Sequence, residues 1–202
     1  MNKKQDSYQY YVSDQINIDK LIKIFNGNLQ LEKTNRNFKK WFNVYSNYTK
    51  ITNKISFNDN NKNNISLDNS WISGFIDAEG CFTATLRVDP RYKSGYKLVL
   101  RFIIDQKLED DTLLHIGELF GKQKIDTRKE INGMSRLVLY SNFDTLINYL
   151  TKFPLKTNKK LSYLRWKRLF FYAKQENLLA TIQNEKAFTK LKRLIKNLNT
   201  SN

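Results

Sequence analysis

Two carboxylates close a short apolar segment in a way that suits chemistry better than packing. The segment runs Trp71-Ile-Ser-Gly-Phe-Ile-Asp-Ala-Glu-Gly-Cys-Phe82, with Asp77 and Glu79 near the carboxyl end of the helix that its pattern predicts. The helix macrodipole disfavours negative charge at that end, where an ordinary packing helix would carry Lys. Gly74 lies in the interior, where it costs about 1 kcal/mol relative to Ala. Both features depart from an ordinary packing helix and predict that the segment has a function.

The small residues of this segment predict where Glu79 lies relative to a partner helix. Gly74 and Ala78 are four residues apart on one helix face, beside Ser73, so a second helix backbone could approach closely. Glu79 would then project from the end of the helix pair, next to its counterpart on the partner helix. Paired carboxylates bind hard divalent cations through oxygen. Such a site suits phosphodiester hydrolysis, because the metal activates water and stabilises the leaving oxygen.

Helices and strands are both expected around this segment, and they alternate along the chain. Strand 81–88 alternates, with Phe82 among the apolar residues on one side and Arg87 on the other. Asn132-Gly133 is a strong signal for a hairpin turn. The order therefore predicts an α+β fold with antiparallel strand pairs. The expected helices are 70–80, 110–120, 142–152, 158–174 and 183–197, and the expected strands are 81–88, 97–106, 122–130 and 135–140.

An Asn-rich stretch at residues 49–70 is predicted to link two parts of the chain, 1–48 and 71–202. The first part is expected to hold a strand at 8–12, a helix at 17–25 and a second helix from about residue 35. An internal repeat with an offset of 125 residues relates the two parts. Its matched positions are Asp19, Leu21, Ile22, Phe38 and Trp41 with Asp144, Leu146, Ile147, Tyr163 and Trp166.

The charge of the chain predicts a polyanionic partner. There are 35 basic and 19 acidic residues, for a net charge of +16, and neutralised phosphates release counterions when they bind such a surface. Residues 152–202 carry 13 of the basic side chains and 2 of the acidic ones, interleaved with aromatic residues. No apolar run reaches the length that a membrane span needs. The single Cys81 excludes an internal disulfide.

Residues 72–80 resemble the LAGLIDADG motif of homing endonucleases and intron maturases. Glu79 stands for the final acid of the motif, while Ile, Ser and Phe replace the Leu, Ala and Leu of its name. The resemblance extends over residues 70–175. The matching motif positions are Gly74, Ile76, Asp77, Ala78 and Gly80, and the similar downstream segments are Phe102-Ile-Ile-Asp-Gln-Lys107, Leu113-Leu-His-Ile116, Phe120-Gly121 and Phe153-Pro-Leu-Lys-Thr-Asn-Lys159.

The resemblance implies an αββαββα unit whose saddle-shaped antiparallel sheet lies in the major groove of double-stranded DNA. It implies Glu79 as ligand of a divalent metal, Mg²⁺, with Gln106 near the scissile phosphate and Lys159 as the basic residue of the site. Gly74, Asp77 and Ala78 would form the helix interface. From the residues alone, Gln106 could instead end a strand, and Lys159 could be one more surface lysine of a basic tail.

Basic residues on the expected strands are the candidates for contacts with bases and phosphates. They are Arg87, Lys97, Arg101, Lys122, Lys124, Arg128 and Arg136.

The first part of the chain is similar to the second half of such a unit. Lys33 follows Leu29 by four residues, as Lys159 follows Leu155. The motif of this partial copy would fall upstream of Met1, so a second acid is expected from an upstream repeat or from a homodimer.

Two functions stay open on this evidence. One is an intron-encoded endonuclease that makes a metal-dependent double-strand cut. The other is a maturase that assists the splicing of its host intron RNA without cutting. Abundant Asn, Lys, Ile, Tyr and Phe indicate an A/T-rich genome, and with the resemblance this favours a mitochondrial location. A structural role in an organellar particle is a third alternative.

Overall fold

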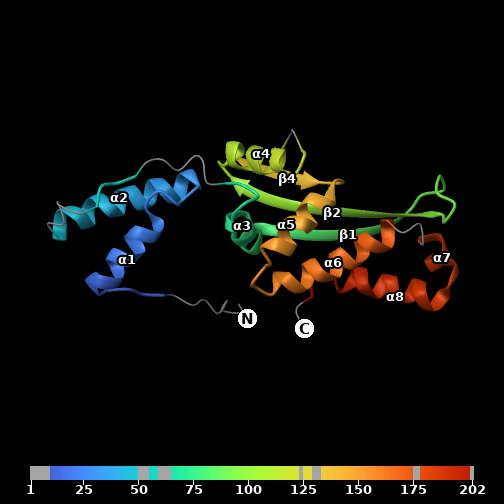
Figure 1. The fold of residues 1–202 in the computed structure, drawn as a ribbon. Helices are drawn as coiled ribbons and strands as arrows, with labels where there is room; N and C mark the ends of the chain where they lie inside the picture. The colour runs from blue at the N-terminus through green and yellow to red at the C-terminus, as the bar shows by residue number, and fades with distance from the viewer. Residues whose placement is uncertain are drawn as a thin grey trace, which may run out of the picture. The chain divides into compact units, whose positions relative to one another are not determined.

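The computed structural model describes residues 10–49, 55–58, 65–122, 125–128, 133–174 and 178–200. The chain forms two compact units that divide between Asn64 and Ile65, inside the stretch expected to be a linker. The first unit contains α1 and α2, and the second contains the sheet and the remaining helices (Figure 1).

Helices α1 (Gln15–Phe25) and α2 (Glu32–Thr49) pack through a small core. The side chain of Asp14 caps α1 by accepting a hydrogen bond from Asn17 N at 2.9 Å. The core consists of Ile22, Phe38 and Phe42, with Ile55 and Phe57 packed against it. Part of the expected linker therefore belongs to this unit. The strand expected at 8–12 is not found in its described residues 10–12, and residues 8 and 9 lie outside the description.

The second unit begins with α3 (Trp71–Glu79), β1 (Gly80–Val88), β2 (Tyr96–Lys107) and α4 (Asp110–Leu119). It continues with β3 (Asp126–Arg128), β4 (Met134–Leu139) and α5 (Phe143–Lys152). This order is αββαββα, as expected. Helices α6 (Lys159–Lys174), α7 (Leu178–Gln183) and α8 (Glu185–Lys196) follow, and the short α7 was not expected from the sequence.

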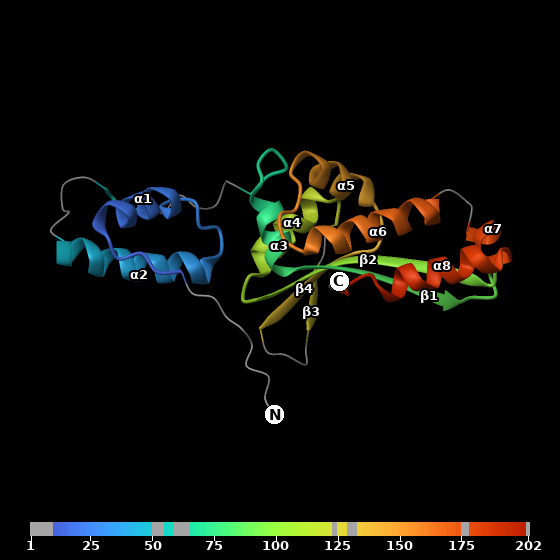
Figure 2. The same cartoon turned by 90° about the horizontal axis from the view of Figure 1, so that it is seen from below.

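The four strands form one antiparallel sheet in the order β1-β2-β4-β3. Phe82 pairs with Phe102, and Phe102 pairs with Leu139, so these buried side chains share one face. Trp166 of α6 packs on Phe82 with ring centroids 5.4 Å apart, and Phe188 of α8 packs on Tyr96. Helices α6 and α8 thus cover this face along the β1–β2 hairpin, as Figures 1 and 2 show. The alternate side chains form the opposite, open face of the sheet.

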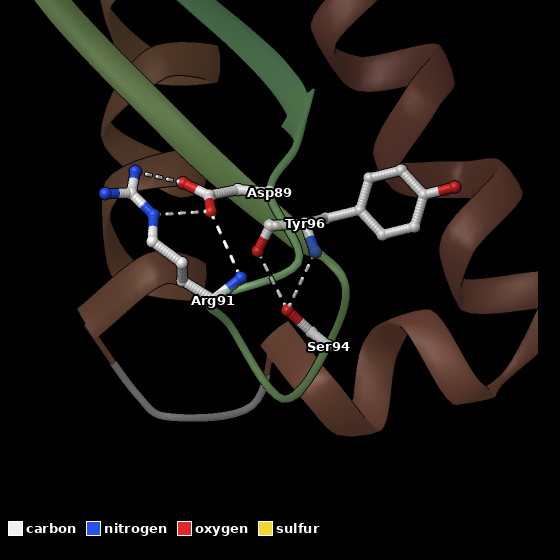
Figure 3. Close-up of polar contacts among 4 residues, drawn as sticks. All are labelled: Asp89, Arg91, Ser94 and Tyr96. Atoms are coloured by element: carbon white, nitrogen blue, oxygen red, sulfur yellow. Dashed lines mark hydrogen bonds and ion pairs between the residues drawn. The ribbon is translucent and has the colours of Figure 1, made fainter.

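The tip of the β1–β2 hairpin is held by its own side chains (Figure 3). Asp89 accepts hydrogen bonds from the backbone N and the guanidinium of Arg91, which keeps the pKa of this carboxyl below its ordinary value. Ser94 Oγ donates to Tyr96 O at 2.8 Å and accepts from Tyr96 N. These contacts fix the turn from which β2 starts.

The segment after α4 corrects the expected strand 122–130. Gly121 adopts a positive φ of 80°, and Lys122 N donates to Gly117 O at 2.7 Å, which closes the helix in a Schellman motif. Because Lys122 belongs to this helix ending, it cannot begin a strand, and β3 starts only at Asp126.

No helix of the described residues is both long and apolar enough to span a membrane.

Candidate active site and nucleic-acid surface

Helix α3 is anchored on its inner face and open on its outer face. Ile72 and Ile76 are fully buried, and the hydroxyl of Tyr149 accepts a hydrogen bond from Ser73 N at 2.9 Å. The same hydroxyl donates to Asn69 O, which ties the start of α3 to α5. Burial raises the pKa of Tyr149, which keeps this donor protonated.

The outer face of α3 carries Gly74 and Ala78, and both are exposed. A Cβ added at Gly74 would meet nothing within 4 Å. Ser73 was expected beside these two residues, but it is only 4% exposed and faces the interior. It lies on the same side of the helix as the buried Ile72 and Ile76. The small-residue surface therefore consists of Gly74 and Ala78 alone.

Asp77 joins the motif helix to the loop before α6. Its Oδ2 accepts a hydrogen bond from Lys156 N at 2.6 Å, and its Oδ1 accepts from Thr157 Oγ1 at 2.7 Å and from Thr157 N at 3.3 Å. Both carboxylate oxygens are thus engaged in positioning the loop. Thr157 Oγ1 in turn accepts from Lys159 N at 3.2 Å, so the contact extends to the first residue of α6.

Lys159 contacts the backbone at the end of α3, where Glu79 is the last residue. Lys159 Nζ donates a hydrogen bond to Ala78 O at 3.1 Å, the carbonyl immediately before Glu79. Glu79 is exposed, and no hydrogen bond or ion pair of its carboxylate is found among the described residues. A cavity of about 660 Å³ lies beside Lys159 and is also lined by Asp77 and Asn199. An ammonium group and a free carboxylate therefore share one end of the motif helix.

Gln106 lies at the same end of the sheet. Gly80, the residue after Glu79, pairs with Ile104 of β2. Gln106 lies two residues further along β2. Gln106 itself pairs with Ser135 and is half buried. It is the penultimate residue of β2, so it does end a strand, and strand alternation places its side chain with Phe102 and Ile104 on the helix-covered face. Its place near the scissile phosphate stays a prediction.

The donor chemistry at this end of α3 fits a divalent cation only in part. Glu79 offers an exposed carboxylate, which is the hard oxygen ligand that Mg²⁺ prefers. Both oxygens of Asp77 already accept hydrogen bonds from the loop before α6. Within the part of the chain that the structure describes, no group of three or more His, Cys, Asp or Glu side chains could hold a metal. A metal held by Glu79 would therefore need further oxygen atoms.

The open face of the sheet is basic. Strand alternation places Arg87, Lys97, Arg101 and Arg136 on this face, opposite the helices. Arg87 and Lys97 are direct register partners, and both are exposed. A duplex lying across this face would meet their charges on two neighbouring strands.

Arg136 and Arg101 differ from these two residues in their surroundings. Arg136 donates two hydrogen bonds to Asp105, at 2.6 and 2.7 Å, and this contact raises the pKa of the arginine. Its charge is therefore already paired. Arg101 Nε and the hydroxyl of its register partner Thr83 are buried without a hydrogen-bond partner in the described structure. Buried polar atoms without partners are rare, and a bound ligand is one explanation for them.

Of the remaining expected contact residues, Lys122 stands apart from the open face. Lys122 follows α4 rather than lying on a strand, and its Nζ donates to Val138 O at 2.7 Å. Lys124 and the side chain of Arg128 lie outside the described residues. Cys81 near the start of β1 is exposed, because it alternates onto the open face beside Phe82, which points inward.

Sequence reasoning missed the residues that hold the site in place. Asp105, Thr157 and Tyr149 act on partners far away in the chain, and Asp77 and Thr157 are separated by 80 residues. Asp105, the one acid of β2, was the available signal, since an acid on a basic face needs a charged partner.

Comparison with known proteins agrees with this geometry. Residues 72–170 match the family model of the LAGLIDADG endonucleases. The chain is 34% identical over 172 residues to the probable intron-encoded endonuclease 4 of Neurospora crassa, a match that covers 83% of this chain and 31% of that protein.

Two solved structures share the fold. The I-LtrWI LAGLIDADG homing endonuclease bound to target DNA superposes with a TM-score of 0.59 at 24% identity, covering 73% of this chain and 48% of that one. I-SmaMI bound to an uncleaved DNA target in the presence of calcium ions gives a TM-score of 0.54 at 26% identity, covering 65% and 45%.

The αββαββα order and the antiparallel sheet of the second unit are the fold that these structures share. This chain belongs to the LAGLIDADG endonuclease family. It spans about a third of the length of its Neurospora relative.

Proposed function

We propose that this chain is part of an intron-encoded homing endonuclease that cuts double-stranded DNA with the help of Mg²⁺. The observation that carries the proposal is the hydrogen bond from Lys159 Nζ to Ala78 O, which holds an ammonium group at the end of the motif helix, on the carbonyl that precedes Glu79. The relatives named above, an endonuclease and two DNA-bound family members, support the same reaction class.

Each residue of the site would have a separate task. Glu79 would hold the metal, which supplies an activated water and stabilises the leaving oxygen when bound. Lys159 would place positive charge where the phosphate becomes more negative, and Asp77 would keep Lys159 in position through Thr157. Gln106 would contact the backbone near the cut.

The open sheet face would bind the duplex. Arg87 and Lys97 would contact phosphates or guanine edges, since their charges are exposed. A base or phosphate oxygen near Arg101 and Thr83 would satisfy the polar atoms that have no partner. Arg136 would contribute less attraction, because Asp105 already pairs with it.

We further propose that the first part of the chain, residues 1–48, is a partial copy of the second unit in which α1 and α2 correspond to α5 and α6. Support comes from positions that the 125-residue offset matches. Trp41 is 43% exposed and Val44 is 70% exposed, whereas Trp166 and Leu169 are 0% exposed beneath their sheet. The residues exposed on α2 in the first unit thus correspond to residues of α6 that the sheet covers in the second unit. A complete site would need its second acid from a longer chain or from another copy.

The test is the variant Glu79→Gln, assayed for Mg²⁺-dependent nicking and double-strand cutting of a plasmid that carries the intronless target. We expect cutting to fall about 100-fold or more while duplex affinity stays within threefold of wild type, because the amide removes charge only at the metal. Glu118→Gln, an exposed change on α4, is the matched control and should cut normally. Persistent cutting by Glu79→Gln would overturn the assignment.

A second candidate function is the binding of host intron RNA during splicing. The observation that favours it is the charge of residues 152–202, 13 basic against 2 acidic side chains, most of which lie away from the strand face. A mitochondrial location is proposed for either function, on the composition of the chain.

A further inference from the structure

A second basic surface lies in the helix layer of the second unit, away from the open sheet. A cavity of about 590 Å³ opens between α6, α7 and α8. Its cationic lining comprises Arg165, Arg168, Lys186, Lys190 and Arg193, and no Asp or Glu lines it in the described chain. Such a concentration of one charge without counterions attracts a polyanion.

Four of these five cations are available to a ligand. Arg165 is used internally, because its Nη1 donates to Asn197 O and Thr200 O. Arg168, Lys186, Lys190 and Arg193 are exposed, and none forms an ion pair in the described part of the chain.

Aromatic rings continue this surface along α6. A neighbouring cavity of about 350 Å³ shares Arg168 and Tyr172 with the first and adds Phe171, which is 42% exposed, and Lys167. Lys167 Nζ lies 6.0 Å from the ring centre of Phe171, and the Arg168 guanidinium lies 5.8 Å from that of Tyr172. Surfaces on which cations alternate with aromatic rings bind unpaired nucleotides. The bases stack on the rings and guanidinium planes, and the cations neutralise the phosphates.

The location separates this surface from the proposed duplex site. The sheet residues that contact α6 and α8, Phe82 and Tyr96, lie on the face opposite Arg87 and Lys97. A stiff duplex on the open face cannot also enter a cavity enclosed by helices on the other side. Its bases are moreover stacked and paired, so they cannot reach Tyr172.

We infer that the joined cavities around Arg168 and Tyr172 bind a run of unpaired nucleotides. This site is separate from the duplex-binding face, and its occupancy does not depend on cleavage. The chemistry is shared by single-stranded RNA and single-stranded DNA, so the two sugars become separate arms of the test.

The experiment measures binding of fluorescent oligouridylate and oligodeoxythymidylate to the 202-residue chain. Lys186→Gln/Lys190→Gln removes two cations of the cavity, and Lys192→Gln/Lys196→Gln removes two exposed cations of the same helix outside it. Circular dichroism and thermal melting confirm that both variants fold. We expect the cavity variant to bind about tenfold more weakly, with a salt slope lower by about 1.4, since each single-strand phosphate contact contributes about 0.7. The control should change less than threefold.

Tyr172→Leu tests the stacking contact by keeping an apolar side chain without the ring. We expect it to weaken both oligonucleotides at least fivefold while duplex affinity stays unchanged. Tighter binding of the RNA arm identifies a transcript as the ligand, and equal or tighter binding of the DNA arm identifies a separated DNA strand. Equal losses in the cavity and control pairs, or full displacement of the oligonucleotide by a short duplex, would overturn the inference. Neither outcome bears on the role of Glu79, which is tested by cutting.

Discussion

Asp77 and Glu79, the two acids of the motif, have different surroundings. Asp77 accepts hydrogen bonds from Lys156 and Thr157, and Thr157 accepts from the backbone N of Lys159. Glu79, two residues later, has none of these contacts and is exposed. We therefore expect a variant at each acid to fail in a different way.

Asp77→Asn should lower both stability and cutting. The amide retains one acceptor and loses the charge, so we expect the free energy of unfolding in urea to fall by about 1–2 kcal/mol. Cutting should fall as well, because Lys159 is no longer fixed. Asp111→Asn changes an exposed acid at the start of α4 and should alter cutting by less than twofold. Loss of cutting without any loss of stability would mean that Asp77 contacts the metal or the DNA itself.

At the scale of elements, the proposed repeat places two similar helix pairs, α1–α2 and α5–α6, in different environments. In the second unit, Trp166 packs on Phe82 and Phe143, and its Nε1 donates to Thr83 O at 3.1 Å on the sheet. In the first unit, Trp41 stacks on Tyr45 with ring centroids 5.3 Å apart and lies near Phe38, both on its own helix α2. The covering sheet accounts for the difference in exposure.

This difference predicts unequal costs for equal substitutions. Trp166→Ala should lower the free energy of unfolding by about 3–5 kcal/mol, because a large buried side chain leaves a cavity. Trp41→Ala should cost less than about 2 kcal/mol, since water already reaches nearly half of its surface. Urea unfolding followed by circular dichroism measures both. Similar losses would show that the first helix pair is covered as fully as the second and would contradict its assignment as an uncovered copy.

At the scale of the whole molecule, the outer face of α3 is the surface at which we propose that this chain meets a second motif helix. Gly74 and Ala78 are exposed there, while the inner face of the same helix is fully buried. If Glu79 binds a metal, one acid does not surround it, so the partner surface would have to bring further oxygen ligands.

Gly74→Ala should separate folding from assembly. Its Cβ meets nothing within 4 Å, so the free energy of unfolding of the chain should rise by up to about 1 kcal/mol. The added methyl group would, however, keep a second helix from approaching closely, and double-strand cutting should fall. Gly117→Ala is the contrasting control: its Cβ would lie 3.0 Å from Leu137 Cδ1 and 3.1 Å from Lys122 O, so it should destabilise the fold. Sedimentation velocity measures self-association of the variant beside the cutting assay. Unchanged cutting by Gly74→Ala would show that this face is not the interface.

The order of the elements and the identity of the motif were readable from the sequence alone. Helices and strands have periods of 3.6 and 2 residues, and their ends are marked by local residues such as Gly121 and Gly133, so these features need no knowledge of distant partners. The αββαββα order, the position of Glu79 at the end of its helix and the place of Lys159 at the start of another follow from such local signals.

The tertiary structure decided what those residues face. The register of Gly80 with Ile104 determines which strand cations lie on the open side, and the pairing of Asp105 with Arg136 removes one of them from the free charge. Ser73 turned inward and Lys122 joined a helix ending because of contacts with neighbouring elements. The bond between Lys159 and Ala78 joins residues 81 positions apart. Contacts of that range depend on how whole elements pack, and no local pattern in the sequence specifies them.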